Sequence, residues 1–192
     1  MGVTRGNGAA HFTVGKLLIA EPMLGDPNFE RSVVLMIEHT EDGALGVVLN
    51  KPTHLEVAAV LDEWAELAAD PPVLYVGGPV EQNGVIALGR RAADAQTEGW
   101  GQVIGDLGTV DLHREPEDIA SGLDGVRFFA GYSGWGPGQL EAELAEDAWL
   151  VVEAAVDDVF APDAETMWRE VLRRQGGKLA MLANFPPHPS MN

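Results

Sequence analysis

The chain of 192 residues carries 30 acidic and 12 basic side chains, which gives a formal net charge of −18, and it contains no cysteine. Its length and its 46% hydrophobic content are sufficient for one buried core, so a wholly disordered chain is excluded. The absence of cysteine excludes disulfides, thiolate nucleophiles and cysteine-ligated metal sites. The negative charge repels phosphate backbones, so direct nucleic acid binding is not expected.

Residues 1–12 lack a basic end followed by an apolar run, so we expect no targeting segment there. Residues 1–11 contain three glycines and no apolar periodicity, which predicts a flexible arm before one domain over residues 12–192. No stretch approaches the roughly 18 consecutive apolar residues of a membrane span. We therefore expect a cytoplasmic protein that does not enter a membrane. No pattern predicts its oligomeric state.

The first half of the chain consists mainly of short β-type runs. Residues 16–20, 32–38 and 45–50 are rich in apolar and β-branched residues, and turn residues bound each run. The Glu41-Asp42-Gly43 turn predicts a hairpin between the second and third strands. Apolar residues between positions 55 and 64 follow helical spacing, which predicts a helix that ends before Pro71. Residues 73–76 and 85–88 predict a second pair of strands.

The second half mixes strands and helices without regular alternation. Strands are predicted at residues 102–104, 109–112, 126–130 and 149–152, and helices at residues 116–121, 139–145 and 163–174. The proline-rich tail at residues 185–189 is expected on the surface. This order favours an α+β domain with a curved, partly antiparallel sheet over a doubly wound parallel sheet.

The glycine-rich segment at residues 131–144 is the most distinctive local feature. Glycine amides that lead into a helix can bind phosphate, but the spacing fits neither a dinucleotide loop nor a Walker loop. Gly131-Tyr132-Ser133-Gly134 begins like a nucleophile elbow, but Trp135 occupies the closing glycine position. We therefore interpret Ser133 as a turn hydroxyl, and the segment as a strand–turn–helix junction that lets Trp135 pack closely.

The five histidines predict no metal site, because no two have the short spacing that presents both imidazoles to one ion. Glu38-His39 ends a predicted strand, and His39 is expected either to face Asp26 or Asn50 across the sheet or to bond backbone. Asn50-Lys51-Pro52-Thr53 resembles a guanine-reading element, but Thr53 replaces its aspartate. Three tryptophans fall on apolar faces and are expected in the core, namely Trp64, Trp149 and Trp168.

Several segments, taken together and in order, resemble the YqgE/AlgH family. They are residues 15–20, 22–34, 38–39 and 43–52, Gly77-Gly78-Pro79-Val80, residues 131–141, Glu143-Leu144 and Trp149-Leu150. The resemblance runs from about Gly15 to the C-terminus. It implies an α+β fold in which a bifurcated, mainly antiparallel curved sheet forms a pseudo-barrel with flanking helices, in a bacterial cytosolic protein. It supplies no established catalytic residues.

Two functions follow as expectations. The AlgH branch is labelled a transcriptional regulator of exopolysaccharide synthesis, and without a helix-turn-helix pattern this label implies indirect regulation. The first expectation is therefore a non-enzymatic regulatory or protein-interaction domain without a cofactor or a metal. The alternative is a small-molecule or anion-binding domain, with hydrolase activity left open. The candidate binding residues are Asp26, His39, Asn50, Ser133, Trp135 and Gln139.

Overall fold

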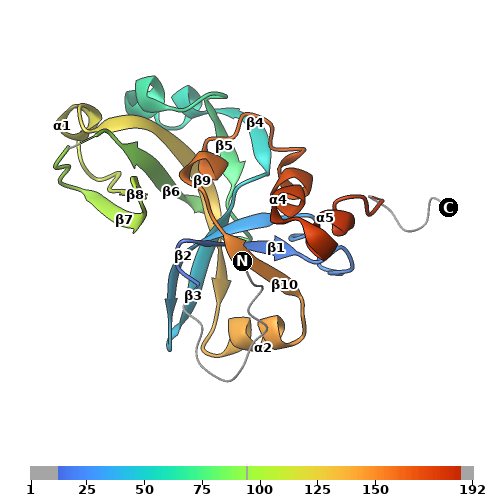
Figure 1. The fold of residues 1–192 in the computed structure, drawn as a ribbon. Helices are drawn as coiled ribbons and strands as arrows, with labels where there is room; N and C mark the ends of the chain where they lie inside the picture. The colour runs from blue at the N-terminus through green and yellow to red at the C-terminus, as the bar shows by residue number, and fades with distance from the viewer. Residues whose placement is uncertain (1–12, 94, 187–192) are drawn as a thin grey trace.

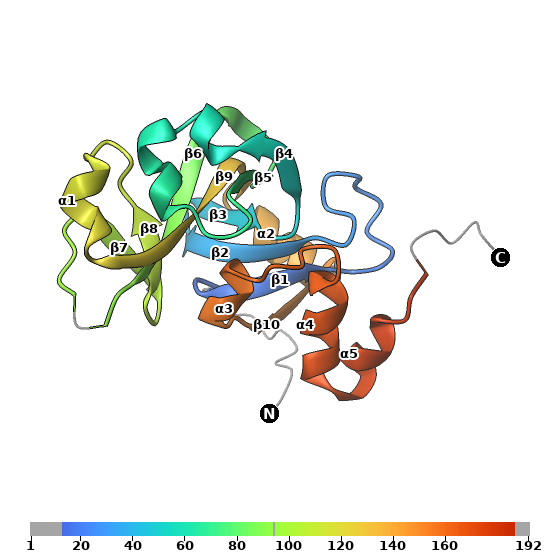
Figure 2. The same cartoon turned by 90° about the horizontal axis from the view of Figure 1, so that it is seen from above.

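The computed structural model describes residues 13–93 and 95–186. A ten-stranded sheet has the order β10-β1-β2-β3-β9-β6-β8-β7, with β4 and β5 joined to it through β9. The sheet curls into a half-barrel with helices on its flanks, as Figures 1 and 2 show. This confirms the predicted α+β fold class. The N-terminal arm and most of the proline-rich tail lie outside the described residues.

The bounds of the elements are as follows. The strands are β1 (Lys16–Ala20), β2 (Val33–Thr40), β3 (Gly43–Val48), β4 (Pro52–Glu56), β5 (Val73–Val76), β6 (Val80–Arg91), β7 (Trp100–Ile104), β8 (Leu107–Val110), β9 (Leu123–Trp135) and β10 (Trp149–Glu153). The helical segments are η1 (Val57–Ala59), η2 (Asp62–Leu67), α1 (Pro116–Ala120), α2 (Gln139–Ala145), α3 (Val156–Val159), α4 (Met167–Gln175) and α5 (Gly177–Leu182).

Strand β9 joins the two halves of the sheet. Its residues pair with β6 along most of that strand, with β5 in parallel at Phe129 and Ala130, and with β3 at Ser133 to Trp135. The sheet is therefore bifurcated at β9. The sequence predicted only residues 126–130 as a strand, because the glycines that follow have low β propensity.

Glycines allow the β5–β6 turn to cross β9 in backbone contact. A Cβ added at Gly77 would lie 2.3 Å from the carbonyl oxygen of Gly131, and one at Gly78 would lie 2.2 Å from that of Tyr132. Gly131 itself has a φ of 68°, in the left-handed region that favours glycine. Side chains at these positions would push the turn away from β9.

Buried apolar side chains occupy both faces of the sheet. Trp64, Trp149 and Trp168 are all buried, as predicted, and the Trp168 indole donates to the carbonyl of Ala20 over 3.0 Å. The buried cation Arg127 donates to the Tyr75 hydroxyl and to the backbone carbonyls of Asp70 and Ala161, and burial lowers its pKa. Arg127 thus connects β9 to β5 and to the segments that contain Asp70 and Ala161.

Tertiary pairing explains where the sequence predictions were wrong. The helix expected between positions 55 and 64 is instead the end of β4 and two short 3₁₀ segments, because residues 52–56 pair with β5. The predicted pairing of residues 73–76 with 85–88 does not form, since β5 and β6 both pair with β9. The β2–β3 hairpin and the bounds of α2 are as predicted. No helix in the described part of the chain is long and apolar enough to cross a membrane.

Candidate functional site

The six candidate residues do not meet in one pocket. His39, Trp135 and Gln139 lie at the α2 end of the molecule, where their side chains bond to residues of α2. Asn50 lies at the opposite end of β2, where its amide contacts Val33 and the carbonyl of Arg31. His39 therefore does not face Asn50 across the sheet. That geometric expectation was wrong, because the two residues flank opposite ends of the β2–β3 hairpin.

Glu143 of α2 is the acceptor for three side chains. Its Oε2 accepts from the indoles of Trp135 at 2.9 Å and Trp149 at 2.8 Å, and its Oε1 accepts from the Gln139 amide at 3.0 Å. The Phe29 ring packs against both indoles, with centroids 6.4 and 5.3 Å away. We call Phe29, Trp135, Gln139, Glu143 and Trp149 the α2 network. It fastens α2 to the sheet and keeps both indoles buried.

His39 fastens the same helix from another strand. The backbone N–H of Thr13 donates to Nδ1 over 3.2 Å, so Nδ1 is an acceptor and Nε2 carries the proton. Nε2 then donates to Glu141 Oε1 over 3.0 Å. The backbone amide of Glu141 and this contact with His39 lower the pKa of the Glu141 carboxyl, although burial opposes them. These contacts give the buried His39 a structural role.

Ser133 and Asp26 also serve the backbone. The buried Ser133 hydroxyl donates to the Gly77 carbonyl over 3.1 Å, and no hydrogen bond within residues 13–93 and 95–186 joins it to a histidine. The Asp26 carboxylate accepts from the Asn28 backbone N–H at 2.8 Å, which closes a turn before β2. The Asp26 contact is a local turn contact of a common kind. Ser133 lies within β9 and bonds a carbonyl 56 positions away, so the expectation of a turn hydroxyl was wrong.

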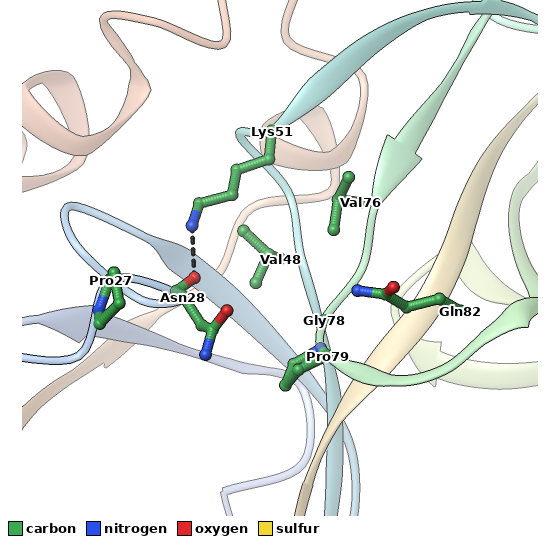
Figure 3. Close-up of a pocket in the computed structure, with 8 residues that line it drawn as sticks. All are labelled: Pro27, Asn28, Val48, Lys51, Val76, Gly78, Pro79 and Gln82. Carbon is green, nitrogen blue, oxygen red and sulfur yellow. Dashed lines mark hydrogen bonds between the residues drawn. The ribbon is translucent and has the colours of Figure 1, made fainter.

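A cavity of about 110 Å³ lies where three segments of the family resemblance meet. We call it the Lys51 cavity. Its lining comes from the β1–β2 loop, the end of β3, Lys51 before β4, the end of β5, the β5–β6 turn and the start of β6 (Figure 3). The lining residues are Pro27, Asn28, Val48, Lys51, Val76, Gly78, Pro79 and Gln82.

The polar groups of the Lys51 cavity have unused hydrogen-bonding capacity. The Lys51 ammonium donates to the backbone carbonyl of Asn28, which is its one hydrogen bond among the described residues (Figure 3). Burial lowers the pKa of Lys51, whereas Asp26 and Glu30 raise it. Asn28 and Gln82 are exposed, and their side-chain amides make no hydrogen bond to another residue within 13–93 and 95–186. The arrangement can hold a small polar group against an apolar wall.

The sequence interpretation named the neighbours of this cavity but not its lining. Asp26 and Asn50 are candidate residues from the sequence, whereas the lining residues Lys51, Asn28 and Gln82 are not. A usable signal was present in Asn50-Lys51-Pro52, where a rare basic residue stands inside a segment that carries the resemblance. Its proximity to Pro79 depends on the crossing of β5–β6 over β9, which no local pattern encodes.

A second cavity of about 290 Å³ is lined by residues of β2, β6 and β8 and by the segment that follows β8. Its walls are mainly apolar, and its acidic group, Asp111, already accepts from the His113 N–H at 3.0 Å and pairs with Arg114 at 3.8 Å. The charged group at its edge is thus used locally. This makes the second cavity a weaker candidate than the Lys51 cavity.

Three arginines, Arg90, Arg91 and Arg174, make contacts within the fold. Arg90 pairs with Asp157 and lies over the Phe160 ring, Arg91 lies over the Trp100 ring, and Arg174 pairs with Asp158 at 2.5 Å. These contacts place carboxylates and rings next to the cations that a nucleic acid would need.

Comparison with known proteins identifies the family. The AlgH-like family model matches residues 17–180. UPF0301 proteins of Streptomyces avermitilis and Thermobifida fusca are 50% and 47% identical over 182 and 187 residues, covering 93% of this chain and 94% of each relative. A crystal structure from Corynebacterium diphtheriae matches with a TM-score of 0.87 and 34% identity over 95% of both chains. The solution structure of AlgH from Pseudomonas aeruginosa matches with a TM-score of 0.66 and 30% identity, over 95% of this chain and 99% of AlgH. The resemblance is thus confirmed, and this chain belongs to the AlgH-like family, which includes the UPF0301 proteins.

Proposed function

We propose that the protein is a non-enzymatic interaction domain that acts on gene expression indirectly, through a partner protein. In this proposal the Lys51 cavity receives one side chain or one peptide group of the partner. The supporting observation is the combination of a small, partly apolar cavity with polar groups that lack protein partners. A net charge of −18 favours contact with a protein over contact with DNA.

The size of the cavity supports a protein partner over a metabolite. Pockets for small molecules and cofactors measure roughly 300–1,000 Å³. The Lys51 cavity, at about 110 Å³, is suited to a single terminal group. The remainder of a partner would then contact the surrounding surface, where the exposed residues Pro27, Asn28 and Pro79 lie.

The hydrolytic alternative has less support. A serine nucleophile needs a base within hydrogen-bonding distance, or within reach through one water. Ser133 donates to Gly77, and His39 is held by Thr13 and Glu141. The two therefore serve different parts of the backbone. Replacing Ser133 with alanine tests this alternative, since a hydrolase that uses Ser133 would lose its activity while keeping its fold.

Site-specific photo-cross-linking in living cells tests the proposal. A photoreactive amino acid is placed at Gln82, on the rim of the cavity, and in a separate variant at the exposed Glu117 of α1. We expect one discrete protein adduct from position 82 that position 117 does not give. The adduct should weaken when Lys51→Met is added to the position 82 variant.

Two outcomes would contradict the proposal. The absence of a discrete adduct at position 82 would mean that no partner protein binds at the cavity. Identical adducts at both positions would mean that the contact does not depend on the cavity. The regulatory half has its own test, in which a deletion strain is complemented with the wild type or with Lys51→Met. Equal transcript profiles in the two complemented strains would show that any effect on gene expression does not depend on Lys51.

A further inference from the structure

The hydrogen-bonding groups of the Lys51 cavity define the chemistry of what it can hold. An ammonium has three N–H donors, and one of the three in Lys51 is used by the Asn28 carbonyl. The side-chain amides of Asn28 and Gln82 each offer donors and an acceptor. A group that both accepts and donates would therefore satisfy more of these atoms than a pure acceptor.

Charge argues against an ionic occupant of either sign. Asp26 and Glu30 lie close enough to raise the pKa of Lys51, so two carboxylates already balance its single positive charge. An anion would enter a site of net negative charge in a chain of net charge −18. A cation would meet the partly desolvated Lys51 ammonium directly. A neutral polar group avoids both costs.

The walls of the cavity set the size and polarity of the rest of the occupant. In Figure 3, Val48 and Val76 lie between the Lys51 and Gln82 side chains, Pro79 lies below Val48, and Pro27 lies on the far side of Asn28. The two valines and the two prolines offer only apolar contacts. The occupant therefore combines a short apolar stem with one neutral polar head.

We propose that the Lys51 cavity binds a carboxamide group of the partner protein. Its carbonyl oxygen accepts from the Lys51 ammonium, and its N–H donates to the side-chain oxygen of Asn28 or Gln82. This inference rests on the proposed role of the cavity in partner binding. Two sources supply the same chemistry: a primary amide from an asparagine or glutamine side chain, and a secondary amide from the partner's main chain.

Titration of the full chain with small probes, followed by ¹H–¹⁵N NMR, tests the carboxamide. The probes are acetamide, N-methylacetamide, sodium acetate and methylammonium chloride at constant ionic strength. We expect acetamide to give saturable shifts at the amides of Lys51, Gly78 and Gln82 at roughly millimolar concentration or above, as its few atoms allow. Acetate and methylammonium should bind at least about ten-fold more weakly, since each ion lacks half of the hydrogen bonds and meets unfavourable charge.

The arms of the titration separate the two sources. Equal binding of N-methylacetamide and acetamide would assign the occupant to a main-chain peptide group. Binding of acetamide alone would assign it to an asparagine or glutamine side chain. Acetate that binds as tightly as acetamide, or acetamide that gives no saturable shift, would overturn the proposal.

Matched variants keep the test specific. Lys51→Met should weaken acetamide binding about ten-fold or more, with its amide spectrum otherwise retained as evidence of folding. Glu30→Gln removes a carboxylate that influences Lys51 and makes no hydrogen bond among the described residues. It should tighten acetate binding a few-fold and leave acetamide unchanged. If acetamide does not bind but cross-linking at position 82 still captures a partner, the carboxamide proposal is wrong and the proposed partner binding remains. If acetamide does not bind and no partner is captured, the proposed partner binding is wrong as well.

Discussion

The α2 network and the Lys51 cavity lie at opposite ends of β3, and they use polar side chains in opposite ways. At the first end, Ala44 pairs with Trp135, and the Glu143 carboxylate receives three donors from the protein itself. At the second end, Val48 lines a cavity in which polar groups keep unused capacity. Polar groups that satisfy one another stabilise the fold, whereas groups that are left over can recognise a partner. The following changes test this contrast in order of decreasing effect on stability.

Replacing Glu143 with leucine should cause the largest loss. Two buried indole N–H groups lose their acceptor, and each unsatisfied group costs about 1–3 kcal/mol. We expect a loss of about 3 kcal/mol, or roughly 10 °C in thermal midpoint for a chain of this length. Differential scanning calorimetry measures it. Glu143→Gln keeps one acceptor oxygen and should lose less stability. Equal losses for both variants would mean that the hydrogen bonds from the indoles do not cause the loss.

Replacing Asn50 with alanine should cause an intermediate loss. The Asn50 amide accepts from the Val33 N–H at 2.9 Å and donates to the Arg31 carbonyl at 2.9 Å. Losing both contacts should cost about 1–2 kcal/mol in urea-induced unfolding. Asn50→Asp keeps the acceptor for the Val33 N–H but sets a carboxylate oxygen against the Arg31 carbonyl, so it should not restore the stability of the wild type. An unchanged midpoint for Asn50→Ala would show that these two hydrogen bonds, which join the segment after β3 to the start of β2, do not contribute to stability.

Replacing Glu141 with glutamine should cause a loss that depends on pH. Because the folded pKa of Glu141 is lowered from 4.5, its ionised form stabilises the folded state above that value. The contribution disappears as the pH falls through the lowered folded pKa. Wild type should therefore exceed Glu141→Gln in stability near pH 7, and the difference should vanish under acid. The exposed Glu146→Gln is the control, and a pH-independent difference for Glu141→Gln would contradict the assignment.

Replacing Lys51 with methionine should change stability least. The side chain makes one hydrogen bond among the described residues, and burial already disfavours its charge. We expect a change within about 0.5 kcal/mol, as for substitutions away from packed features. Chemical denaturation measures it. A loss as large as that of Glu143→Leu would make Lys51 part of the scaffold and would end the contrast between the two regions.

Local patterns predicted the elements whose contacts are local. The β2–β3 hairpin follows from its Glu41-Asp42-Gly43 turn, and α2 follows from the spacing of Leu140 and Leu144. Long-range pairing decided the rest. Residues 52–56 carry part of a helical pattern, but they form strand β4 because they pair with β5. The later start of α4, at Met167 instead of position 163, is a boundary of the kind that sequence patterns place poorly.

The candidate residues show the same division. Asp26, His39 and Gln139 lie in the turn, at the strand end and at the helix start that local patterns predict, but Ser133, which we expected in a turn, lies within β9. The partner of each side chain could not be read from the sequence. His39 finds Glu141 more than a hundred positions away, and Ser133 finds Gly77 only because the β5–β6 turn crosses β9. The Lys51 cavity exists through that same crossing. Its lining residues are separated along the chain and share no periodicity.

The position of β9 has a consequence for how the molecule opens. Because this strand pairs with β3, β5 and β6, its central amides are released only when several strand pairings break together. The amides of Phe129 and Ala130 should therefore exchange with deuterium only through global unfolding. Strand β7 ends the sheet order and its backbone pairs with one strand, β8, so its amides should exchange earlier. Solvent would enter this protein from the rim of the half-barrel and reach β9 last.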